Sequence, residues 1–151
     1  MNRVLLICLL LLACSDVSEE KVKTMYMIDG EVMPYVLDFE RDVKSIGLEL
    51  NNSNKSFSVV LGRLPYRIAG IAIAMDNKFA VNVVLNIQLW HKLSDAEKRA
   101  LVYHELAHDV YGLRHNTCDL MSGTLRSITQ EMIDELLDTL TKQQNNGRLL
   151  L

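Results

Sequence analysis

The segment YHELAHDVYGLRHNTCDLMSG, at residues 103–123, constrains this chain more than any other part of it. His104 and His108 are four residues apart, so in a helix their imidazoles lie on one face, about one turn apart. Such a pair can bind zinc, and Glu105 beside it can reach a metal-bound water without binding the metal itself. The pattern predicts a helix that carries a catalytic zinc ion, with Glu105 as general base.

The residues that follow could complete this site. Gly112 can end the helix in the left-handed conformation, which turns the chain back and brings His115 to the same metal. Met121 follows in a turn of small residues, and an accidental HExxH is a weaker interpretation when these residues accompany it. Asp119 is an alternative third ligand. Cys118 could supply a thiolate, although a small buried residue is the simpler interpretation.

In type and order these residues resemble the signature of the metzincin zinc endopeptidases, HExxHxxGxxH followed by a methionine-containing turn. The spacing differs at one place. Residues 109–111 stand between His108 and Gly112 where the signature has two residues, so Arg114 occupies the usual ligand position. One more helical residue before the turn would absorb this difference. The longer spacing looks like that of small metalloprotease-like lipoproteins of Bacteroidetes-type bacteria.

The resemblance implies an α+β fold. We expect a small single domain in which a twisted mixed sheet packs against a central zinc-binding helix, with one N-terminal and one C-terminal helix. The resemblance also implies peptide substrates that lie antiparallel to an edge strand, Met121 as a structural residue, and one catalytic Zn²⁺ held by His104, His108 and His115. The tyrosine ligand of some metzincins is not expected, because Gly123 stands at its position.

Peptide hydrolysis is the chemistry that this pattern favours. Glu105 would accept the proton of a zinc-bound water as it attacks the peptide carbonyl, and would pass it to the leaving amine. Asp109 and Asp119 are candidates for the acceptors that orient the imidazoles. The alternative is a zinc-binding surface lipoprotein that binds a protein partner without cleaving it, since so small a domain has little wall for a deep cleft.

The N-terminus has the pattern of a secretory signal. Arg3 precedes a short apolar run at residues 4–13 that is too brief to span a bilayer. Residues 11–14 look like a bacterial lipobox, which predicts lipid attachment to Cys14; an ordinary signal peptide is the alternative. We therefore expect an exported protein, anchored by lipid to the outer membrane or cell surface. The expected divisions are a signal peptide at 1–13, a lipidated cysteine and acidic tether at 14–33, the domain at 34–144 and a tail at 145–151.

Composition excludes some functions. A net charge of −3 without a basic cluster argues against nucleic-acid binding. A chain of 151 residues with 49% hydrophobic content suits one compact domain, which we expect to be a monomer. If Cys8 leaves with the signal and Cys14 carries lipid, Cys118 has no disulfide partner within the chain.

Hydrophobic spacing and capping patterns predict the elements around the motif. Trp90 is expected in the core and the state of residues 24–28 is left open. The expected elements are a helix from Pro34 that ends before Gly47, a strand at 57–61, a hairpin of 68–75 and 79–85, the zinc helix from about Asp95 after a capping box at Ser94 and Glu97, and a last helix capped by Thr129.

Overall fold

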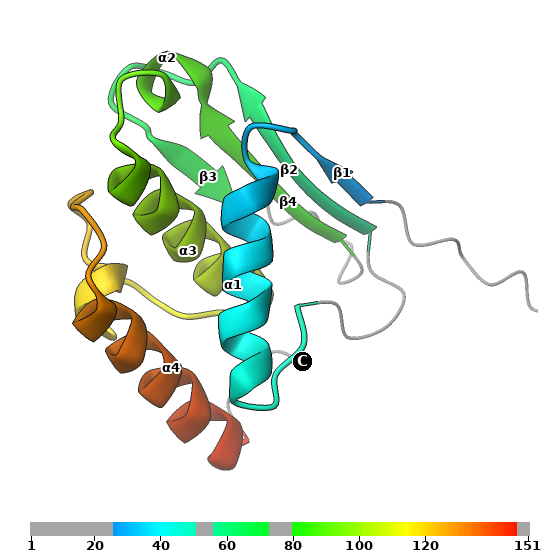
Figure 1. The fold of residues 1–151 in the computed structure, drawn as a ribbon, viewed down its shortest axis with the longest axis vertical. Coiled ribbons are helices and arrows are strands. Elements are labelled where there is room, and N and C mark those ends of the chain that lie inside the picture. The colour runs from blue at the N-terminus through cyan, green and yellow to red at the C-terminus, as the bar shows by residue number, and fades with distance from the viewer. Residues whose placement is uncertain (1–25, 51–55, 73–79, 148–151) are drawn as a thin grey trace, which may run out of the picture.

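The computed structural model describes residues 26–50, 56–72 and 80–147, which form a four-stranded mixed sheet, four α-helices and one short 3-10 helix (Figure 1). This mixed architecture is compatible with the expected α+β class. In chain order the elements are β1 (Tyr26–Ile28), α1 (Met33–Ser45), β2 (Ser56–Gly62), β3 (Gly70–Ala72), β4 (Ala80–Asn86), α2 (Ile87–Trp90), α3 (Asp95–Tyr111), the 3-10 helix η1 (Asp119–Met121) and α4 (Gln130–Asn145).

Several expectations fall outside the described residues. These are the signal peptide, Cys14, the acidic tether up to residue 25, the hairpin turn at 76–78 and the end of the tail. Within the described ranges, no helix is both long and apolar enough to cross a membrane.

The sheet has the strand order β1-β2-β4-β3, so β3 is an edge strand. β1, β2 and β4 run parallel, whereas β3 pairs antiparallel with β4, as expected for the hairpin. Alternate side chains of the two central strands are buried, because successive residues of a strand point to opposite faces. The buried set is Phe57, Val59, Val83 and Leu85. One face of the sheet therefore carries the core, and α1 and α3 cover it (Figure 1).

Helix α3 begins and ends where the sequence predicts. The hydroxyl of Ser94 accepts from the backbone N–H of Glu97 at 3.3 Å, and the Ser94 N–H donates to the Glu97 carboxylate at 2.8 Å. These two bonds form the expected capping box. At the other end Gly112 has φ 67°, in the left-handed region, and its N–H donates to the His108 carbonyl at 3.0 Å. The prediction of this helix is confirmed at both ends.

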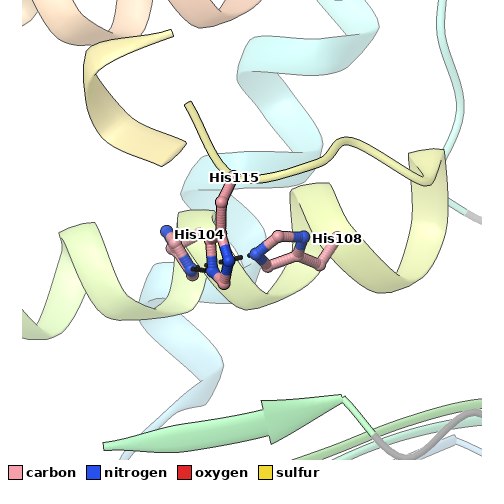
Figure 2. Close-up of side chains that lie close together, drawn as sticks. All are labelled: His104, His108 and His115. Carbon is pink, nitrogen blue, oxygen red and sulfur yellow. Dashed lines mark hydrogen bonds between the residues drawn. The ribbon is translucent and has the colours of Figure 1, made fainter. Parts of the chain in front are cut away.

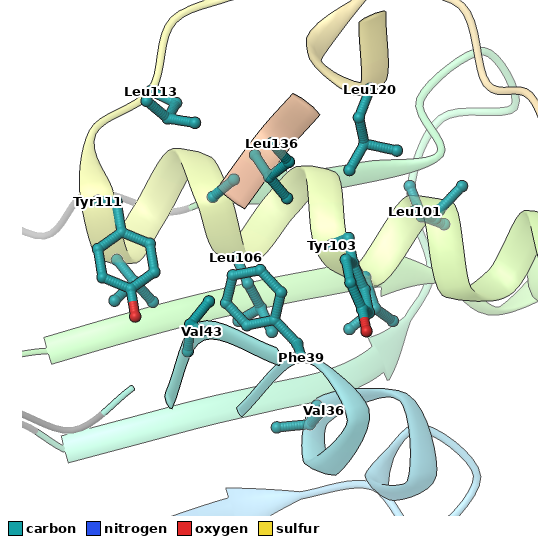
Figure 3. Packing of buried hydrophobic residues seen from close by; sticks show 14 of the residues in the cluster. Val36, Phe39, Val43, Leu101, Tyr103, Leu106, Tyr111, Leu113, Leu120 and Leu136 are labelled. Carbon is teal, nitrogen blue, oxygen red and sulfur yellow. The ribbon is translucent and has the colours of Figure 1, made fainter. Parts of the chain in front are cut away.

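Helix α3 lies in the middle of the protein. Figure 3 shows side chains of α1 on one side of it, where the rings of Phe39 and Tyr103 meet edge to face with centroids 5.0 Å apart. Leu136 of α4 and Leu120 of η1 cover the other side. Trp90 is 0% exposed, which confirms it as a core residue. Because α3 is packed on both sides, side chains that it carries are held on a rigid element.

A polar network fixes α3 against α1 beside the histidines. The hydroxyl of Tyr103 donates to the carboxylate of Asp42 at 2.6 Å, and Arg99 donates to the same hydroxyl at 3.0 Å. Arg99 and Asp42 also form an ion pair at 3.3 Å. Burial raises the pKa of Tyr103, and the charge of Asp42 adds to this, so the phenol stays protonated and remains a donor.

Replacing Tyr103 by Phe should destabilise the protein by about 1 to 2 kcal/mol, because a partly buried carboxylate loses a hydrogen bond. The midpoint of chemical denaturation measures this, with Tyr66→Phe as a control because Tyr66 is 69% exposed. Equal midpoints for the two variants would show that the network does not hold α3 in place.

Candidate metal centre

Three imidazoles converge next to the middle of α3. His104 and His108 lie on the helix and His115 on the loop that follows it (Figure 2). Their ligand nitrogens all lie within 4.8 Å of one another. Among the described residues, these three histidines form the group of potential ligands that could hold a metal ion. The three histidines proposed from the sequence are therefore close enough to bind one ion.

The extra residue in the motif is absorbed as predicted. Residues 109–111 are all helical, and the chain reverses only at Gly112. The N–H of Leu113 then donates to the Ala107 carbonyl at 3.1 Å, which fixes the reversal. Arg114 is exposed and His115 is directed back toward the helix (Figure 2).

Backbone carbonyls orient two of the rings. Nδ1 of His104 lies 2.9 Å from the Leu120 carbonyl oxygen, and Nδ1 of His108 lies close to the carbonyl of Leu113. A carbonyl only accepts, so each Nδ1 carries the proton and each Nε2 carries a lone pair. The sequence predicts Asp109 as a candidate acceptor, and its carboxylate accepts from the backbone N–H of Asn82 in β4 at 2.8 Å.

The distances between these nitrogens fit a metal ion. Nε2 of His104 lies 3.1 Å from Nε2 of His108 and 3.3 Å from Nε2 of His115, as the dashed lines of Figure 2 mark. Two ligands at 2.0 to 2.1 Å from a tetrahedral ion are about 3.3 Å apart. Two lone pairs that face each other at this distance repel unless a cation lies between them.

A metal ion suits this position better than a proton. Burial lowers the pKa of both His104 and His108, and neighbouring histidines lower it further. Protonation to the imidazolium is therefore disfavoured near neutral pH. The rings are neutral, which is the form that binds metals.

The turn that contains Met121 contacts the residues of the site. The Leu120 carbonyl that orients His104 belongs to η1, and Met121 in the same turn is 0% exposed. The N–H of Asn116, next to His115, donates to the Met121 carbonyl at 2.9 Å. Asn116 has φ 63°, a left-handed conformation that asparagine tolerates. The turn thus ties the third histidine to the helix that carries the other two.

The two alternative ligands lie elsewhere. Asp119 is exposed, its carboxylate is 3.6 Å from the guanidinium of Arg126, and its N–H donates to Glu135 at 3.0 Å. Cys118 is buried, as its simpler interpretation predicts, and burial raises the pKa of its thiol. His115 completes the group that the structure brings together.

Glu105 is buried beside the histidines, between α3 and the edge strand. Its side chain is 7% exposed, and burial, with the charge of Asp109, raises the pKa of its carboxyl to about 7. A Cβ on Gly70 of β3 would lie only 2.7 Å from the Glu105 carboxylate oxygen. The absence of a side chain at Gly70 is therefore what allows Glu105 to occupy this position.

A cavity of about 280 Å³ opens beside the histidines. His104, Glu105 and His115 line it together with residues of β3, η1 and the loop before α4. Its volume is near the lower limit of about 300 Å³ for ligand pockets. A peptide side chain would fit, whereas a large ligand would not.

Comparison with known proteins adds no assignment: no family model, curated protein or solved structure matches this chain.

Chelator-treated protein titrated with Zn²⁺ should bind one ion per chain. His115→Ala should weaken binding by more than about 100-fold, because loss of a ligand costs more than loss of a partner that orients one. His91→Ala is the matched control, since His91 is exposed and outside the group. If Asp119→Ala weakened binding and His115→Ala did not, the assignment of His115 as the third ligand would be wrong.

Gly70→Ala should destabilise the metal-free protein by about 1 to 3 kcal/mol, because the added methyl overlaps Glu105. In a Glu105→Ala background this cost should disappear, which a double-mutant cycle in chemical denaturation would measure. Gly123→Ala is the control, since its added methyl would meet no atom within 4 Å. The same cost in both backgrounds would exclude the contact.

Proposed function

We propose that this protein is a zinc-dependent endopeptidase of metzincin type, in which His104, His108 and His115 hold one Zn²⁺ and Glu105 is the general base and acid. The single observation that carries the proposal is the convergence of three imidazoles beside a cavity that is lined by a buried carboxylate. Three protein ligands and one open position are typical of catalytic zinc, whereas structural zinc sites have four protein ligands.

Zinc is the metal that the donor set favours, although imidazoles also bind copper, iron and nickel. The nitrogen spacing of 3.1 and 3.3 Å fits tetrahedral coordination. When bound, zinc supplies a water of lowered pKa and a Lewis acid that polarises the peptide carbonyl. The chain supplies the fixed ligand geometry and the carbonyl acceptors of Leu113 and Leu120.

Glu105 is suited to move a proton at this site. It follows His104 on α3 and lines the same cavity, and burial raises its pKa to about 7. A carboxyl group with a pKa near the working pH can both accept and return a proton. Glu105 therefore takes the proton from the attacking water and gives it to the leaving amine.

The edge strand β3 is suited to align a peptide. Within the described residues its outer edge has no neighbouring strand, and Gly70 on it lies directly over Glu105. An extended peptide can add to such an edge through main-chain hydrogen bonds. An antiparallel peptide on β3 would then pass the cavity with its backbone beside the reacting groups.

The proposal extends to location. The signal and lipobox patterns that end at Cys14 support an exported, lipid-anchored enzyme that acts as a monomer on peptides or proteins at the cell envelope. The alternative remains a zinc-binding lipoprotein that binds a partner without cleaving it, and the small cavity favours that alternative.

Zinc-loaded protein should cleave an unfolded protein such as reduced casein, and Glu105→Gln should lower the rate about 10²- to 10⁴-fold while the zinc content stays the same. A chelator should stop cleavage and added Zn²⁺ should restore it. Glu131→Gln is the control, because Glu131 is an exposed glutamate of α4. Cleavage that is equal in wild type and Glu105→Gln, or absent from both, would contradict the enzyme and favour the partner-binding alternative.

A further inference from the structure

Two arginines line the cavity that holds His104 and Glu105. Arg67 comes from the loop before β3 and Arg126 from the loop between η1 and α4. Both residues are exposed, so their guanidinium groups are accessible to a ligand. The sequence patterns gave no role to either residue.

The loop that carries Arg67 is held by a buried asparagine. The side-chain N–H₂ of Asn86 donates to the carbonyls of Leu64, Pro65 and Ile68, at 3.3, 3.2 and 2.8 Å. Its side-chain oxygen accepts from the N–H of Gln88 at 3.1 Å, and Asn86 is 0% exposed. This asparagine fixes the loop on both sides of Arg67, which reduces the entropy lost when a ligand binds.

Arg126 is held more loosely. Its guanidinium lies 3.6 Å from the carboxylate of Asp119, and both side chains are more than half exposed. An exposed ion pair of this kind contributes little stability. Asp119 can therefore keep Arg126 near the cavity and give way to a carboxylate of a ligand.

The charges around the cavity favour an anionic group. Its lining carries the two arginines and one carboxylate, Glu105, and Glu105 is buried beside the histidines. A bound metal ion would add further positive charge. The rest of the lining includes apolar side chains of Leu101, Leu125 and Met132. An apolar wall with accessible guanidinium groups fits a part of a peptide that ends in a carboxylate.

We propose that Arg67 and Arg126 bind a carboxylate of the peptide, so that the cavity selects peptides that present a carboxylate to it. The inference rests on the proposed function in that the peptide lies along β3. It does not depend on cleavage, because binding can be measured without turnover. The carboxylate comes from an aspartate or glutamate side chain or from the peptide C-terminus.

The test uses zinc-loaded Glu105→Gln protein, which binds without cleaving, and two synthetic random heptapeptide libraries. One library has amidated C-termini and the other has free C-termini. Each library is applied to immobilised protein at low salt, and the retained peptides are sequenced. We expect Asp and Glu to exceed Asn and Gln by about tenfold in the amidated library, or the free-acid library to be retained about tenfold more strongly.

The double variant Arg67→Gln/Arg126→Gln, made in the same background, should lose this preference. The matched control is Arg63→Gln, which removes an exposed arginine of the same loop that does not line the cavity. Retention without preference for acidic residues or for free C-termini, a preference that survives the double variant, or no retention from either library would overturn the inference. Cleavage of casein by wild type would still support the proposed function in each of these cases.

Discussion

Two hydrogen bonds from imidazoles to backbone carbonyls determine what the histidine cluster can do. Because Leu120 and Leu113 accept the Nδ1 protons of His104 and His108, the Nε2 lone pairs of both rings face each other. Burial disfavours a proton there, which leaves a metal ion as the cation that removes the repulsion. The rest of the structure positions these carbonyls and the ring of His115.

The fold meets this requirement with a buried helix and two short turns. Packing on both sides fixes α3, and the left-handed Gly112 sends the chain back over it. The turn at η1 then supplies one carbonyl to His104 and another to the N–H beside His115. The edge strand β3 approaches the carboxylate of Glu105 closely only because Gly70 lacks a side chain. The three histidines, Glu105 and the edge strand β3 are thus positioned by contacts with α3.

The sequence could predict those parts of this arrangement that depend on neighbouring residues. The capping box at Ser94, the stop at Gly112 and the extra helical residue before it are local, and the structure has all three. Parts that depend on distant segments could not be predicted. The acceptors of the imidazoles are backbone carbonyls, which every residue type has and which the sequence therefore does not reveal. Asn86 likewise holds a loop about 20 positions earlier in the chain through backbone carbonyls. The pairing of β1 with β2 also joins distant segments, so the sequence around residues 26–28 does not predict it.

In the proposed site, three imidazoles and no other protein group bind one zinc ion. X-ray absorption at the zinc edge of the zinc-loaded full chain tests this most directly. We expect one four-coordinate zinc with three imidazole nitrogens and one water oxygen at about 2.0 to 2.1 Å. A shell with only two imidazoles, or one that contains a sulfur at about 2.3 Å from Cys118, would contradict it.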